Sequence, residues 1–261
     1  MCFSFDARPP APPADLLLAP IAGGGGPELL ELSAADGARF SAALAESPAV
    51  GDVGDVGVVI LPDVRGLYGF YVELAERFAE AGHHAIAIDY FGRTAGLGMR
   101  EEEFEYMPHV MQMKVEQVQL DIQAAIGALR ERTGAERIAT VGFCLGGLQS
   151  FLADTNAELG LSGAVGFYAA LDGSRMGVVG PLARAADIRG PLLGLFGGED
   201  QAIPVEQVQE FQSRLAEGGV EHDIHVYPGA PHSFFDRRYE EHAEACADAW
   251  RRVLEFLSAD G

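Results

Sequence analysis

The stretch Ile138-Ala139-Thr140-Val141-Gly142-Phe143-Cys144-Leu145-Gly146-Gly147 decides the fold of this chain. Its first four residues are typical of a buried strand, and a helical pattern follows at 146–157. The glycines at positions 142 and 146 leave room for two backbone segments to approach each other at the central residue. The stretch therefore predicts a strand that turns sharply into a helix, with Cys144 at the turn.

Short apolar runs alternate with longer amphipathic segments on both sides of this stretch. Further strands are expected at 56–61, 85–88, 163–168, 192–196 and 222–227, and helices at 70–81, 111–130, 146–157, 205–217 and 239–258. Near-continuous apolar strands are typical of a parallel sheet that is covered on both faces. The pattern predicts an α/β fold with a mostly parallel central sheet and helices on both faces. An antiparallel strand over 39–45 is expected at the sheet edge.

The composition of each segment predicts the domain organisation. Residues 1–27 contain the proline-rich run 8–13 and the glycine run 23–26, so we expect an extended arm, either packed on the surface or loosely docked. Residues 28–261 show no internal repeat and no second linker, which predicts a single domain. The acidic turn Gly51–Asp55 lacks the twelve-residue calcium pattern, and no metal site is predicted.

Charge and cysteine content exclude several classes of function. The 261-residue chain carries a formal net charge of −21, which disfavours binding to nucleic acid or to an anionic membrane surface. No apolar run approaches the roughly 20 residues of a membrane span, and the first residues lack a signal-peptide pattern. Three cysteines without a CxxC pair fit a reducing compartment, so a cytoplasmic location is expected.

The turn at Cys144 has the form G-x-C-x-G, which is the cysteine counterpart of the G-x-S-x-G nucleophile elbow. The helix that begins after Cys144 places its positive dipole end there, which favours the thiolate. The backbone N–H of Leu145 faces the same space and is suited to stabilising an oxyanion. The alternative is a buried structural cysteine. Cys2 and Cys246 have no motif around them.

A cysteine nucleophile needs a base, and the base needs an acid that orients it. Asp200 follows the strand at 192–196, and His232 follows the strand at 222–227, so both lie at the carboxyl edge of the expected sheet. Glu199 is the rival acid, and we prefer Asp200 because its shorter side chain supports an imidazole more compactly. The structural alternatives are a helix cap for Asp200 and a core histidine for His232.

With these three residues placed, the sequence resembles the dienelactone hydrolase (carboxymethylenebutenolidase) family of α/β-hydrolases over most of residues 29–258. The resemblance rests on five stretches, namely Gly142–Gly147, Gly198–Asp200, Gly229–Phe234, Leu61–Gly66 and Asp89–Thr94. It implies the α/β-hydrolase fold and a Cys144–His232–Asp200 triad that opens lactones or esters through a thioester. No cofactor or metal is implied.

The resemblance also implies roles for residues around the triad. The backbone N–H of Val64 is expected to complete the oxyanion hole with that of Leu145. Asp63 stands where the family has a glutamate that holds the resting thiol. Arg93 matches an arginine that binds a substrate carboxylate. The position of a second such arginine is taken by Asp236, with Arg237 beside it as the remaining substrate-binding candidate.

We therefore expect a hydrolase of a small ester or lactone, active as a monomer or small homo-oligomer. Phe143 and Phe234 are candidates for lining the substrate pocket, together with Leu145, Phe235 and Tyr106, although each also fits a core position. Two alternatives use the same scaffold, a redox- or electrophile-sensing thiol protein and a non-catalytic ligand-binding protein. The first would not need Asp200 and His232.

Overall fold

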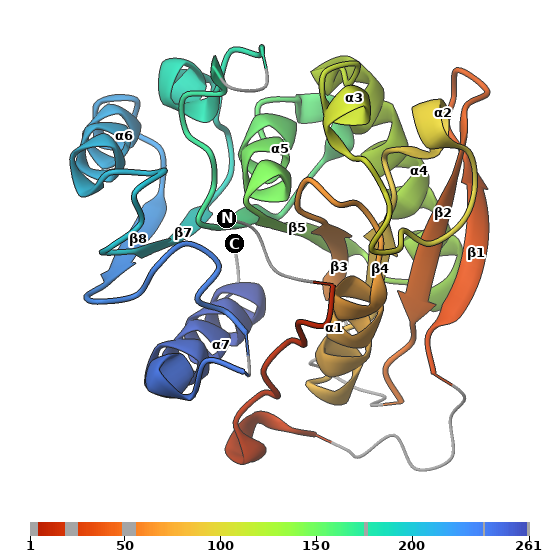
Figure 1. Cartoon of the computed structure of the whole chain (residues 1–261), viewed down its shortest axis with the longest axis horizontal. Coiled ribbons are helices and arrows are strands. Elements are labelled where there is room, and N and C mark those ends of the chain that lie inside the picture. The colour runs from red at the N-terminus through yellow and green to blue at the C-terminus, as the bar shows by residue number, and fades with distance from the viewer. Residues whose placement is uncertain (1–4, 19–25, 49–55, 175–176, 237, 260–261) are drawn as a thin grey trace.

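The computed structural model describes residues 5–18, 26–48, 56–174, 177–236 and 238–259, which form an eight-stranded sheet flanked by helices (Figure 1). The strands are β1 (Glu28–Ser33), β2 (Arg39–Ala45), β3 (Val56–Leu61), β4 (Ala85–Ile88), β5 (Arg137–Phe143), β6 (Gly163–Phe167), β7 (Leu192–Gly197) and β8 (His222–Tyr227). Their order is β1-β2-β4-β3-β5-β6-β7-β8. β2 runs antiparallel to both of its neighbours, and the remaining pairs are parallel. The predicted mostly parallel α/β architecture is confirmed.

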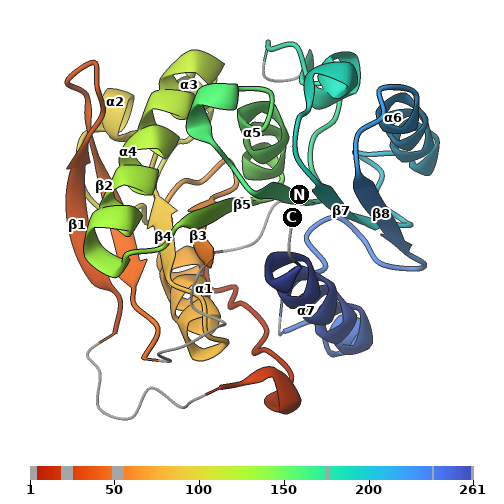
Figure 2. The ribbon, with the colours of Figure 1, turned by 180° about the vertical axis from the view of Figure 1, so that it is seen from behind.

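Helices cover both faces of the sheet (Figures 1 and 2). Helices α1 (Gly69–Glu80) and α7 (Ala243–Ser258) lie on one face, and α4 (Val115–Thr133), α5 (Leu145–Ala153) and α6 (Val205–Glu217) lie on the other. The short helices are α2 (Gly92–Ala95), α3 (Met107–Val110), η1 (Ala14–Leu16), η2 (Ala157–Leu159), η4 (Pro181–Asp187) and η5 (Glu240–His242). Among the helices of the described residues, none combines the length and apolarity that crossing a bilayer requires.

The sheet is buried because helices pack against both of its faces. All residues of β3, β4, β6 and β7 are buried. Helix α1 directs Phe70, Leu74 and Phe78 toward the sheet at helical spacing, and the Phe78 ring lies 4.9 Å from that of Trp250 on α7. The core therefore fixes the carboxyl ends of β3, β5, β6, β7 and β8 at one edge, where the loops described below begin.

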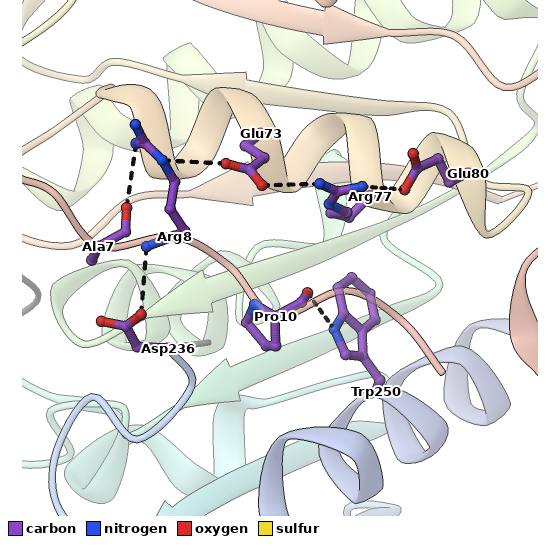
Figure 3. A network of polar contacts seen from close by, with 8 residues as sticks. All are labelled: Ala7, Arg8, Pro10, Glu73, Arg77, Glu80, Asp236 and Trp250. Carbon is purple, nitrogen blue, oxygen red and sulfur yellow. Dashed lines mark hydrogen bonds and ion pairs between the residues drawn. The ribbon is translucent and has the colours of Figure 1, made fainter. Parts of the chain in front are cut away.

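The arm, residues 5–18 as described, runs between α1 and α7 (Figure 3). Ala7 is fully buried, and the Trp250 indole N–H donates to the Pro10 carbonyl over 3.0 Å. Arg251 of α7 forms two hydrogen bonds with Asp15, at 2.6 and 3.0 Å. Residues 5–18 therefore pack against α1 and α7.

Several element boundaries differ from the predictions. The edge strand is β1, which we did not predict, so β2 lies one position inside the sheet. Helix α4 begins at Val115 rather than at 111, because Lys114 is extended. It ends at Thr133 rather than at 130, and Gly134, with a φ of 74°, caps its last turn. Helix α5 ends at Ala153 instead of 157. Three features of the sequence lie outside the described residues, namely the turn Gly51–Asp55, residues 23–25 of the glycine run and Cys2.

Candidate functional site

Cys144 lies at a sharp turn between β5 and α5. Its backbone has φ 55° and ψ −108°, a left-handed conformation that costs a non-glycine residue about 1–3 kcal/mol and is typical of functional turns. A Cβ at position 142 would overlap the Gly146 carbonyl, and one at position 146 would overlap the carbonyl of Leu61. The two glycines are therefore required, and they bring the end of β3 against the first turn of α5.

The two described cysteines differ in accessibility. Cys144 is partly exposed, whereas Cys246 on α7 is buried. Burial raises the pKa of the Cys246 thiol to about 12, and this thiol donates to the Phe234 carbonyl at 3.3 Å. Cys246 is thus an unreactive core residue, and Cys144 is the described cysteine that a substrate or reagent can reach.

Asp200 and His232 form a hydrogen-bonded pair. Asp200 Oδ2 lies 2.6 Å from His232 Nδ1, and both side chains are nearly inaccessible to solvent. The other oxygen, Oδ1, accepts the backbone N–H groups of Ala202 at 2.8 Å and Ile203 at 3.2 Å. Glu199 is exposed, and its backbone rather than its carboxylate ties it to the neighbouring loop. The geometry thus pairs Asp200 rather than Glu199 with His232, and the catalytic role of Asp200 stays a prediction.

Tyr168, which the sequence analysis missed, connects the histidine with the elbow. The Cys144 N–H donates to the carbonyl of Phe167, the residue before Tyr168, over 3.0 Å. The Tyr168 ring packs against the His232 ring with centroids 4.9 Å apart, and its φ of 38° is unusual for a non-glycine residue. Cys144 thus contacts the last residue of β6, and His232 contacts the residue that follows it. The only sequence signal for Tyr168 was its position at the end of a predicted strand.

The β3 loop, residues 62–68, lies beside the elbow. The Asp63 N–H donates to the Tyr71 hydroxyl at 2.9 Å, and Gly66 N–H closes a turn onto the Asp63 carbonyl at 3.1 Å. Among the described residues, neither the Val64 N–H nor the Leu145 N–H has a hydrogen-bond acceptor. The first residue of a helix has no intrahelical acceptor, so the Leu145 N–H remains available to a ligand. These two groups are suited to an oxyanion hole, and their catalytic role stays a prediction.

Asp63 contacts an arginine of its own loop. Its carboxylate accepts hydrogen bonds from Arg65 Nε at 3.1 Å, Nη2 at 2.5 Å and the backbone N–H at 2.9 Å, and both side chains are buried. The sequence analysis expected Asp63 to hold the resting thiol of Cys144. That role stays untested, and the bidentate pairing with Arg65 weighs against it.

Arg93 is also paired with carboxylates of the protein. Its guanidinium lies 2.6 Å from Asp36 and 2.8 Å from Asp121, and it donates to the Gln117 carbonyl at 3.2 Å. Burial raises the pKa of Asp121 to about 6. These contacts occupy the group that was expected to bind a substrate carboxylate, so that role of Arg93 stays a prediction without support from the geometry.

The remaining substrate-binding candidates lie in the core or outside the described residues. Phe143 is fully buried and stacks on Phe167 with centroids 4.6 Å apart. Phe234 is fully buried against Tyr227 and Tyr168. Arg237 is not among the described residues. Pocket lining by the two phenylalanines stays a prediction, and their burial favours the core alternative.

A cysteine at a strand–helix elbow, followed in chain order by an aspartate and a histidine at the same sheet edge, defines an α/β-hydrolase. The family model of the dienelactone hydrolase family matches residues 40–260, and the chain belongs to this family. The prediction of a dienelactone hydrolase-like carboxylic-ester hydrolase is confirmed at the level of this enzyme class.

Individual relatives agree with this assignment. A Yersinia pestis protein provisionally named carboxymethylenebutenolidase is 30% identical over 210 residues, which are 78% of each chain. An Escherichia coli K12 protein with the same provisional name is 30% identical over 214 residues, 78% of this chain and 77% of that one. The crystal structure of a Klebsiella pneumoniae protein, provisionally a dienelactone hydrolase, aligns with a TM-score of 0.77 and 25% identity. It covers 90% of this chain and 100% of that one.

Proposed function

We propose that this protein hydrolyses small esters or lactones through a thioester on Cys144, with His232 as the base and Asp200 as the group that orients it. The observation that carries the proposal is the buried 2.6 Å contact between Asp200 and His232, at the same edge of the sheet as a partly exposed elbow cysteine. A structural histidine does not require a buried aspartate that is itself fixed by two backbone N–H groups.

The proposed reaction has two halves. In the first, the Cys144 sulfur attacks the carbonyl carbon after His232 takes the thiol proton, and the N–H groups of Val64 and Leu145 stabilise the resulting oxyanion. The tetrahedral intermediate breaks its bond to the alcohol oxygen, which leaves with the proton from His232. In the second half, His232 takes a proton from water as the water oxygen attacks the thioester carbon. The C–S bond then breaks, the acid is released, and the Cys144 sulfur takes the proton back from His232.

The proposal includes the setting of the reaction. A reducing compartment such as the cytoplasm keeps an accessible cysteine in its thiol form, and the acidic net charge disfavours polyanionic partners. We propose a small-molecule substrate and a monomer or small homo-oligomer of this chain.

The test uses purified protein with p-nitrophenyl acetate and a panel of lactones and esters, each as a neutral and a carboxylated member. We expect turnover by the wild type and by Cys246→Ala, and no turnover by Cys144→Ala. The panel would contradict the proposal if no member is hydrolysed, or if Cys144→Ala retains the rate of the wild type. Binding without turnover would favour a non-catalytic ligand-binding protein.

A further inference from the structure

The arm touches both loops that carry the proposed catalytic groups. It begins before the region matched by the family model, which starts at residue 40. At the β3 loop, the Phe5 ring lies 5.0 Å from the Tyr68 ring, and the Arg65 guanidinium carbon lies 5.5 Å from the Phe5 centroid. At the loop after His232, the Arg8 N–H reaches the buried Asp236 carboxylate at 3.5 Å (Figure 3).

We propose that the arm positions the oxyanion-binding N–H of Val64, and that it acts through the contact of Phe5 with Arg65. Phe5 and Arg65 are positioning residues in this proposal, because neither is placed against the reacting atoms. The proposal rests on the function proposed above.

The Asp63–Arg65 pair fixes the backbone on both sides of Val64. The two residues flank Val64, and their side chains are joined by hydrogen bonds at 3.1 and 2.5 Å. A bidentate carboxylate–guanidinium contact has a defined plane, so it fixes the two peptide units between the paired residues. The Tyr71 hydroxyl fixes the start of the same segment by accepting the Asp63 N–H. The direction of the Val64 N–H is therefore set by this pair.

The arm shields the Asp63–Arg65 pair from water. The Arg65 guanidinium lies over the Tyr68 ring at 4.8 Å and over the Phe5 ring at 5.5 Å, and its side chain is only 4% exposed. A cation–π contact is stronger where water is excluded. Removing the Phe5 ring would admit water beside Arg65, and a higher local dielectric would weaken its attraction to Asp63.

Phe5 is held in place by the rest of the arm. The segment after Phe5 is fixed by the buried Ala7 and by the hydrogen bond from Trp250 to Pro10. Arg8 adds an ion pair to Glu73 of α1 at 3.6 Å (Figure 3). The arm is thus attached to α1 and α7 independently of the β3 loop, and it presents Phe5 to that loop from a fixed position.

The experiment compares two reactions of the same cysteine. Hydrolysis of p-nitrophenyl acetate passes through an oxyanion, whereas alkylation of Cys144 by iodoacetamide does not. The variants are Phe5→Ala, Phe5→Tyr and Arg65→Lys, and the control is Arg251→Gln, which removes the exposed contact of α7 with Asp15 of the arm. Each is assayed at a temperature at which circular dichroism shows it to be folded. Phe5→Leu serves as a milder substitution if Phe5→Ala is unstable.

We expect Phe5→Ala to lower kcat for the ester about tenfold and Arg65→Lys about 100-fold, the second approaching the loss of one oxyanion donor. KM and the alkylation rate of Cys144 should stay within about twofold of the wild type. Phe5→Tyr, which keeps the ring, should restore kcat, and Arg251→Gln should not change it.

Equal losses in kcat and alkylation rate would overturn the inference, because the arm would then act on the whole fold. Unchanged kcat in Phe5→Ala and Arg65→Lys would overturn it as well. A wild type that is active but not inactivated by alkylation of Cys144 would overturn the proposed function, and this inference with it. This result can be told apart from a failure of the inference alone, since it is obtained with the wild type, before any arm variant is made.

Discussion

Replacing Asp200 with asparagine tests the proposed triad most directly. Asp200 Oδ1 accepts two backbone N–H groups, from Ala202 and Ile203, while Oδ2 faces His232 Nδ1. In Asp200→Asn, the amide oxygen will take the Oδ1 position because only an acceptor fits two N–H donors. The amide NH2 then donates to Nδ1, and the imidazole proton is forced onto Nε2. A histidine in that tautomer cannot accept the thiol proton.

The size of the effect follows from the cost of the opposite orientation. Turning the amide so that its oxygen faces His232 would leave the N–H of buried Ile203 unsatisfied, at about 1–3 kcal/mol, whereas exposed Ala202 can turn to water. The productive orientation is therefore disfavoured by about 1–3 kcal/mol, which corresponds to a rate loss of about 5-fold to 150-fold. We expect a fall in kcat of about 100-fold, within this range, with little change in KM.

The assay is steady-state hydrolysis of p-nitrophenyl acetate by Asp200→Asn, with Glu199→Gln as the matched control. Glu199 is the adjacent, exposed carboxylate, so its loss should leave kcat within about twofold. A loss of less than about fivefold in Asp200→Asn, or a larger loss in Glu199→Gln than in Asp200→Asn, would refute this account of the triad. A thermal unfolding curve for each variant separates loss of the tautomer from loss of the fold.

Three further predictions follow from other parts of the structure. Iodoacetamide should inactivate the protein by labelling Cys144 before Cys246, whose thiol pKa burial raises to about 12, and peptide mapping of the inactivated protein checks this order. Arg93→Ala should lower the free energy of unfolding by about 3 kcal/mol, because it leaves the buried Asp121 without its cation. Urea denaturation measures this loss, and Arg132→Ala is the exposed control. Burial lowers the pKa of His83 to about 4, below its unfolded value near 6.5. The folded state therefore binds a proton at His83 less readily than the unfolded state. The stability of the fold is full above pH 6.5 and decreases as the pH falls toward 4. The loss amounts to about 3 kcal/mol, and urea denaturation of His83→Gln between pH 4 and 7 should give a flatter profile than the wild type.

Much of the fold could be predicted because the central strands are short apolar runs. Such runs are typical of a sheet that helices cover on both faces. The elbow could be predicted because its two glycines are required by close backbone contacts. β1 escaped prediction because its sequence Glu-Leu-Leu-Glu-Leu-Ser belongs to a half-exposed edge, where few residues need to be apolar. Helices α2 and α3 have only four residues each and give no periodic signal.

The partners of the charged residues were harder to predict than the elements. Arg93 meets Asp36 and Asp121, which lie 57 and 28 positions away in the sequence, so the spacing contained no sign of these ion pairs. The packing of the arm likewise depends on Trp250, 240 positions from Pro10. By contrast, the Asp63–Arg65 pair joins neighbours in one loop, and its two opposite charges were visible in the sequence.

The pairing of these arginines bears on the charge of the substrate. Among the described residues, the three arginines with the least exposed side chains are all bound to carboxylates: Arg65 to Asp63, Arg93 to Asp36 and Asp121, and Arg100 to Asp89. A substrate carboxylate that bound to one of these three arginines would displace a protein carboxylate such as Asp63, Asp89 or Asp121 and leave it buried without a cation, at a cost of about 3–5 kcal/mol. The net charge of −21 adds long-range repulsion of anions. A neutral ester or lactone meets neither penalty, so the neutral members of the substrate panel should be hydrolysed at least as fast as their carboxylated counterparts.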